Sequence, residues 1–260
     1  MTAILRLESR IRLRGPAVLV GVFALLAALY YSIFPEFAAD AERIEEAFPA
    51  FLFDFFGIEA LHTIEGFIAA ELYSFFWVVF VGIYFAALGA GMIAGEVSDR
   101  TLDLTLSNPV SRESVLLQKV AALWVPLVVL NVGVAIVVYA GAIAIGESIN
   151  PLALAMVHLL SVPYLLVCAG IGLMASVLVD RVRTARAAAL STVLLLWLIV
   201  SASRLDAEFE WVGALTPSRY YDETKILVRE EYAFLDAGLL LVVFLVLLGV
   251  ATLVFTRRDI

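Results

Sequence analysis

Residues 16–34 read PAVLVGVFALLAALYYSIF, a run of nineteen residues without a charged side chain. An α-helix rises about 1.5 Å per residue, so this run is long enough for the roughly 30 Å hydrocarbon layer of a membrane. Because backbone groups in lipid must be hydrogen-bonded within their own segment, such a run is expected to be a helix. Five further apolar segments follow, at about 68–94, 120–145, 152–179, 188–203 and 237–256. The sequence therefore predicts an all-α integral membrane protein with six transmembrane helices in one domain, residues 1–260.

The composition excludes a soluble fold. The chain has 260 residues, of which 63% are hydrophobic and 16% are charged, whereas soluble domains average about 45–50% apolar and about 25% charged residues. A single domain of this length has no way to bury so much apolar surface away from water. The lone cysteine, Cys168, lies in an apolar run and permits neither an intrachain disulfide nor a CxxC site.

The distribution of basic residues predicts the orientation of the chain. Cytoplasmic loops of membrane proteins are enriched in Lys and Arg. If the N-terminus is cytoplasmic, twelve basic residues fall on the cytoplasmic side and five fall outside, which are Arg43, Arg204, Arg219, Lys225 and Arg229. An even number of spans then places both termini in the cytoplasm.

Residues 4–14, ILRLESRIRLR, predict a basic amphipathic helix before the first span. Arg6, Arg10 and Arg14 repeat at every fourth position, and Ile4 and its apolar neighbours form an adjacent face. This pattern suits a helix in the headgroup layer, and it also suits an ordinary positive flank that fixes topology. A cleaved signal peptide is disfavoured, because its apolar core is usually only about 7–15 residues long.

Residues 100–119, RTLDLTLSNPVSRESVLLQK, interrupt the apolar sequence between the second and third spans. A helix over 96–107 would place charged residues on one arc beside leucines, with Glu96 and Arg100 forming a favourable pair one turn apart. Pro109 would end this helix, and Ser111 would cap the next one with Glu113 in its first turn. The spacing leaves two interpretations open, because this helix could dock on a cytoplasmic partner or lie on the membrane.

The same stretch resembles the permease subunits of ABC transporters, and more narrowly their type-2, exporter-like family. That family has an acidic residue, then TL-x-x-L-L-S-x-P-V-S-R, then an apolar restart ending in Gly-Lys. The likeness extends over the whole chain, including LTPSRYYD at 215–222 and the end FTRRDI. This chain departs from the pattern at Arg100, where a glycine is usual, and at Thr105, which interrupts a Leu-Leu pair.

The resemblance implies that residues 95–118 form a coupling helix on a separate ABC ATPase, which would bind ATP and Mg²⁺. It also implies a second permease subunit, lipid contacts, export, a plasma-membrane location, and no nucleic-acid partner, enzymatic activity or cofactor in this chain. The residues expected to contact the ATPase are Glu96, Asp99, Arg100, Leu102, Asp103, Leu106, Pro109 and Arg112. A non-transporting scaffold that docks another protein through 95–118 is the alternative, and a polytopic membrane enzyme is disfavoured.

The sequence contains few candidates for chemistry of its own. It has no GxxxxGK[ST] loop for nucleotide phosphates and no HExxH metal motif. The runs GAG at 89–91 and GIG at 170–172 lie inside spans and predict close helix packing. Polar residues inside membranes mark possible substrate paths, so Glu71, Asn131 and His158 are candidates, although each is also the kind of residue that bonds to a neighbouring helix or reaches the interface.

The two outer segments differ in their expected structure. Residues 35–67 mix acidic and aromatic residues and predict short helices along the membrane surface. Residues 205–235 resemble the family segment that forms a re-entrant helical pair or lid, whereas their spacing alone indicates an amphipathic cap.

Overall fold

The computed structural model describes residues 3–101, 107 and 110–258, and in this part of the chain all regular structure is helical. Six of its helical segments are long and apolar enough to cross a membrane. They are Ile4–Ala39, Ile64–Ala90, Arg112–Ala144, Pro151–Leu178, Val182–Ser203 and Phe234–Arg257. The predicted all-α fold with six spans is therefore confirmed.

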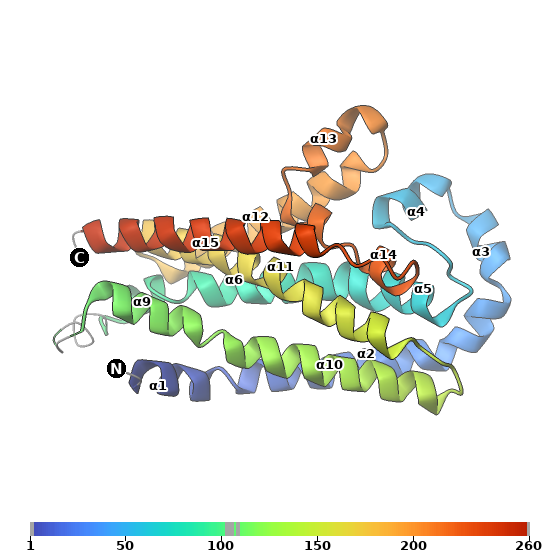
Figure 1. Cartoon of the computed structure of the whole chain (residues 1–260), viewed down its shortest axis with the longest axis horizontal. Helices are drawn as coiled ribbons and strands as arrows, with labels where there is room; N and C mark the ends of the chain where they lie inside the picture. Colours follow the sequence, from blue (N-terminus) through green and yellow to red (C-terminus); the bar gives the residue numbers. More distant parts are fainter. Residues whose placement is uncertain (1–2, 102–106, 108–109, 259–260) are drawn as a thin grey trace.

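Both chain termini lie at the same end of an elongated helical bundle (Figure 1). We call this the basal end and the opposite one the distal end. At the basal end lie α1 (Ala3–Ile11) and α9 (Arg112–Ala121). At the distal end lie the short helices α3 (Ala41–Ala47), α4 (Ala50–Phe56), α5 (Ile64–Ile68) and α14 (Glu223–Leu227). Short helices between the first two spans, as expected, are thus present as α3 and α4.

Helix α11 (Pro151–Leu178) is the centre of the bundle and packs extensively against α6 (Gly82–Ala90) and α15 (Phe234–Arg257). Two glycines set the distance between α6 and α11. A Cβ on Gly89 would lie 2.0 Å from the carbonyl oxygen of Ala169, and a Cβ on Gly172 would lie 2.0 Å from that of Ala86. The two backbones therefore touch where only glycine fits, as the GAG and GIG runs predicted.

The second span has an unexpected local form. After α5 it continues as a π-helix, Ala69–Val81, before it returns to α-helical geometry in α6. Such helices are rare and are usually a single turn long. Thr63 caps the start of this span, because its hydroxyl accepts a hydrogen bond from the Gly66 amide at 3.1 Å.

Several spans extend beyond the apolar runs that predicted them. The first contains α2 (Arg14–Ala39), and the third contains α9 and α10 (Trp124–Ala144), so it begins eight residues before the predicted start at 120. Helix α12 (Val182–Ser203) begins before the predicted 188. Hydropathy marks the lipid-facing length of a helix, whereas the hydrogen-bonded helix continues through its basic flank.

The segment before the last span folds back on the distal end of the bundle. Its short helix α13 (Glu210–Gly213) packs on α12, and α14 packs against α11 and the second span. Two side chains fasten it, because the Tyr221 hydroxyl donates to the Val157 carbonyl at 3.0 Å and the Thr224 hydroxyl donates to the Gly57 carbonyl at 2.9 Å.

Candidate functional site

The polar stretch between the second and third spans begins with a short helix, α7 (Ala94–Ser98). Its start is held by α11, because the hydroxyl of Ser176 accepts hydrogen bonds from the amides of Ile93 and Ala94, both at 2.9 Å. Ser176 is fully buried. The beginning of the predicted coupling segment is therefore fixed to the central helix of the bundle.

The sequence predicts a continuous helix over residues 96–107. This prediction is wrong, because α7 ends at Ser98. Arg100 has a φ of 55°, in the left-handed region. Its amide donates to the Val97 carbonyl at 3.2 Å, and the Thr101 amide donates to the Glu96 carbonyl at 2.9 Å. These two bonds form a Schellman C-cap, whose left-handed residue is usually glycine. This explains why the family pattern has glycine where this chain has Arg100.

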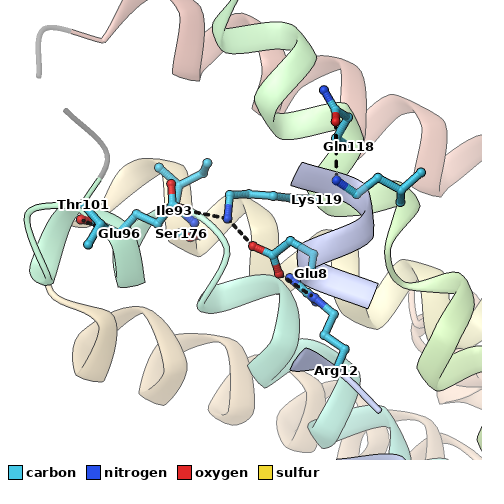
Figure 2. A network of polar contacts seen from close by, with 9 residues as sticks. Glu8, Arg12, Ile93, Glu96, Thr101, Gln118, Lys119 and Ser176 are labelled. Atoms are coloured by element: carbon cyan, nitrogen blue, oxygen red, sulfur yellow. Dashed lines mark hydrogen bonds and ion pairs between the residues drawn. The ribbon is translucent and has the colours of Figure 1, made fainter. Parts of the chain in front are cut away.

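Glu96 pairs with Lys119 (Figure 2). It does not pair with Arg100, which is the partner that the sequence predicted. Lys119 is only 3% exposed, and its Nζ lies 2.7 Å from Glu96 Oε1 and 2.5 Å from Glu8 Oε1. The other oxygen of Glu8 accepts from Arg12 Nε at 3.0 Å. A buried cation requires such partners, because an uncompensated charge away from water is very costly. Lys119 thus joins α1, α7 and α9.

The end of α7 is attached to the turn between α11 and α12. The hydroxyl of Ser98 donates to the carbonyl of Asp180 at 3.0 Å and accepts from the amide of Val182 at 3.2 Å. A displacement of α7 would therefore act on the fourth and fifth spans together.

Arg112, whose predicted role in coupling to an ATPase stays a prediction, binds the last span. Its Nη1 donates to the carbonyls of Arg258 at 2.5 Å and Phe255 at 3.3 Å, and its guanidinium lies 5.9 Å from the Phe255 ring centroid. These carbonyls at the C-terminal end of α15 have no partner within the helix, so Arg112 caps that end. Arg258 in turn donates to the Val177 carbonyl at 2.8 Å and pairs with Asp180.

Together these contacts close into a ring around the basal end. We define the basal ring by its contributing side chains, which are Glu8, Glu96, Ser98, Arg112, Lys119, Asp180 and Arg258. It passes from α7 to α9, from α9 to α15, and from α15 through the α11–α12 turn back to α7, with α1 attached at Lys119. The ends of all six spans are therefore connected.

Outside this ring, Asp99 and Arg100 are exposed, and among the residues described here neither side chain has an ion-pair partner. Residues 94–101, which we call the basal elbow, are thus anchored on their inner face by the basal ring and carry the exposed charges of Asp99 and Arg100. Ser111 begins α9 as predicted, because its hydroxyl accepts from the Ser114 amide at 3.2 Å. Leu102, Asp103, Leu106 and Pro109 lie outside the described residues.

A comparison with protein-family models assigns the chain, since the model described as ABC-2 family transporter protein matches residues 2–260. The chain belongs to the ABC-2 transporter family. It is therefore a multi-pass membrane protein of a family of transport subunits. Neither the curated proteins nor the solved structures that were searched gave a match.

The candidate path residues of this ABC-2 protein fall into two groups. Asn131 and His158 both contact Ser161. The Ser161 hydroxyl donates to the side-chain oxygen Oδ1 of Asn131 at 3.1 Å and to the backbone carbonyl of His158 at 2.8 Å. His158 Nε2 also lies 2.9 Å from the hydroxyl of Tyr73. These contacts hold the second, third and fourth spans together, which is the usual use of polar residues between membrane helices.

Glu71 lies apart from that group, on the π-helix near the distal end. It is half-buried and lines a cavity of about 500 Å³ together with Phe55, Phe75 and Trp197. A role of these three polar residues in a substrate path stays a prediction, and the geometry separates Glu71 from the other two.

Sequence reasoning missed the central residue of the basal ring of this ABC-2 protein. The sequence places Lys119 only at the end of the polar stretch before the third span, and it indicates no role for Glu8. Both had a signal, because Lys119 is one of two lysines among seventeen basic residues and Glu8 is the only acidic residue before Glu36. An isolated acid in a basic segment indicates an ion pair, but the sequence does not identify the partner.

Proposed function

We propose that this chain is the membrane-spanning permease subunit of an ATP-driven exporter, and that its basal elbow docks on a separate ATPase subunit. ATP and Mg²⁺ bind that partner, while this chain holds no cofactor and carries out no covalent chemistry. Two permease subunits and two ATPase subunits form the complex in the plasma membrane. Family membership and six spans support the permease role, and the family resemblance supports export and the assembly.

One observation carries the coupling role. The elbow that begins at α7 is fixed to every span through the basal ring, yet Asp99 and Arg100 remain exposed at its tip. A partner that moves this tip would therefore move the helix ends as a body. Rigid-body displacement of this kind is an established way to transmit a conformational change between subunits.

The test reverses a charge at the tip. Asp99→Lys changes an exposed side chain that holds no ion pair within the described residues, so the chain should still insert and fold. Co-purification of the ATPase and stimulation of its hydrolysis should both fall. Glu46→Lys is the matched control, because it reverses an exposed acid on α3 at the distal end. Unchanged binding and hydrolysis with Asp99→Lys and with Arg100→Glu would exclude docking at this elbow.

The proposal requires the basal end and both termini to be cytoplasmic. Asp99→Cys provides a labelling site, and the native Cys168 is fully buried and will not compete for the reagent. A membrane-impermeant thiol reagent should modify Asp99→Cys only after the cytoplasmic side is opened, and Glu46→Cys in intact cells. The opposite pattern would reverse the orientation and refute the proposal.

The scaffold alternative makes a different prediction for the same complex. A scaffold would retain a bound partner without regulating its ATP hydrolysis. Loss of hydrolysis control in the Asp99→Lys complex, with some ATPase still bound, would favour the permease role.

A further inference from the structure

A groove of about 510 Å³ runs between α1 and the start of α10 at the basal end. Its volume lies within the range of about 300–1,000 Å³ that is usual for ligand sites. Its walls are mostly apolar and include Leu5 and Leu13 on α1, and Trp124 and Val128 on α10. The side chains of Leu13, Trp124 and Val128 are each about half exposed, so this wall is open to a ligand.

The rim of the groove is cationic. Arg6 and Arg10 line it from α1, with Ser9 beside them. They stand four residues apart, so they project from the same face of the helix. Both are exposed, and within the described part of the chain neither guanidinium has a hydrogen bond or an ion pair.

Two other cations of this region, Arg12 and Lys119, already have carboxylate partners. Arg12 and Lys119 share the carboxylate of Glu8, and that pairing fixes the opposite side of α1 to the basal ring. Helix α1 thus presents the paired Glu8 to the protein and the unpaired Arg6 and Arg10 to the groove. This asymmetry leaves Arg6 and Arg10 available to an anion from outside the chain.

We propose that this groove binds a phospholipid with an anionic headgroup. Guanidinium groups match the geometry of phosphate and bind it in a bidentate manner, and the Ser9 hydroxyl is a third donor on the same rim. The apolar wall accommodates an acyl chain, and an exposed tryptophan is typical of the membrane interface. A soluble anion would not need the apolar wall, and an apolar peptide would not need the two arginines.

The inference rests on the geometry of α1 and α10 and does not depend on docking to an ATPase. Bound lipid would hold α1 in place, and α1 is joined to α9 both at Lys119 and by the Leu5 amide, which donates to Gln118 Oε1 at 3.4 Å. The lipid site and the basal ring are therefore mechanically connected through one short helix.

The experiment measures retention of phosphatidylglycerol by the purified full-length chain. Native mass spectrometry counts bound lipids after incubation in mixed phosphatidylcholine and phosphatidylglycerol micelles. The double substitution Arg6→Gln and Arg10→Gln should weaken phosphatidylglycerol retention by about 30-fold, at about 1 kcal/mol for each basic residue. Phosphatidylcholine retention should not change.

Two further variants separate the groove from general surface charge. Arg181→Gln with Arg183→Gln removes two exposed arginines at the same end of the bundle and should leave retention unchanged. Val128→Trp keeps both rim arginines but fills the groove, and it should lower retention. Equal loss in the Arg181/Arg183 variant, or full retention in Val128→Trp, would overturn the proposal.

The same measurements would also reveal two other occupants of the groove, which are a free anion and a second copy of the chain. Competition by inorganic phosphate as strong as that by phosphatidylglycerol would indicate a free-anion site and would refute the lipid proposal. Loss of a chain dimer in the Arg6/Arg10 variant, without a change in lipid retention, would assign the groove to a second copy and refute it as well. Failure of ATPase binding would affect neither result.

Discussion

The basal and distal ends of the bundle differ in whether a buried ionisable side chain has an ion-pair partner. At the basal end the nearly buried Lys119 has two carboxylate partners, at 2.5 and 2.7 Å. At the distal end Glu223 is 4% exposed, and the described residues give it no ion-pair partner within 4.0 Å. Burial, together with the nearby Asp222, raises the pKa of Glu223 to about 7 despite the opposing charge of Arg204.

We therefore expect the two ends to respond differently to substitution. A compensated network holds the helix ends together through fixed contacts. A carboxyl group with a pKa near 7 exists in both protonation states, so the distal cap that carries it depends on pH. The basal end thus joins the spans through paired charges, whereas the distal cap buries a carboxyl group that has no ion pair among the described residues.

The largest effect is expected from Lys119→Met. This change leaves Glu96 without its partner and brings two carboxylates together without the cation between them. Removal of one partner from a buried pair typically costs about 3–5 kcal/mol, so the thermal unfolding temperature in detergent should fall strongly.

The matched control is Lys119→Met combined with Glu96→Gln. In this variant Glu8 keeps Arg12 at 3.0 Å, and no unpaired carboxylate remains. Most of the lost stability should return. If the double variant were as unstable as the single one, packing of the lysine stem rather than charge would explain the effect, and the contrast between the two ends would lose its basis.

The second prediction concerns Glu223→Gln at the distal end. The folded-state pKa of about 7 exceeds the ordinary value of 4.5, so the folded protein holds the proton more tightly than the unfolded chain. Stability from this group is complete below about pH 4.5, and it is lost as pH rises through about pH 7. At about 1.4 kcal/mol per pH unit, the loss at higher pH is roughly 3 kcal/mol.

Glutamine cannot ionise, so Glu223→Gln should be more stable than the wild type at about pH 8 and should match it near about pH 4. Thermal unfolding across this range measures the difference. Glu46→Gln, at an exposed distal position, should show no such pH-dependent gain. A stability difference for Glu223→Gln that stays constant with pH would contradict the assigned protonation.

The third prediction concerns Arg100, the residue of the basal elbow that has a left-handed backbone conformation. A residue with a side chain in left-handed conformation costs roughly 1–2 kcal/mol, and Arg100 has that conformation. Arg100→Gly should therefore stabilise the elbow by about 0.5–1 kcal/mol, after the greater entropy of unfolded glycine is included. Arg100→Ala removes the same charge without this relief and should not stabilise the protein.

The sequence alone was sufficient for some features and not for others. Long charge-free runs predicted the six spans, and the Ser-x-Glu pattern predicted the cap at Ser111, because both depend on neighbours in the sequence. The basal ring depends on the rotation of distant helices, since Glu8 and Lys119 are separated by 111 positions. The left-handed Arg100 had a partial signal, because it replaces the glycine of the family pattern.

The smallest change in unfolding temperature is expected from Arg229→Gln. This variant tests whether burial, rather than pairing geometry, makes the ion pairs of Lys119 stabilising. Arg229 forms a two-point pair with Glu59 at the distal end, with Nε and Nη2 at 2.9 and 2.6 Å from the two carboxylate oxygens. This geometry is as good as that of Lys119, yet both side chains are more than 40% exposed. Water and salt screen such pairs, so Arg229→Gln should leave the unfolding temperature nearly unchanged, with any shift smaller at high salt. A loss as large as that of Lys119→Met would show that pairing geometry matters more than burial.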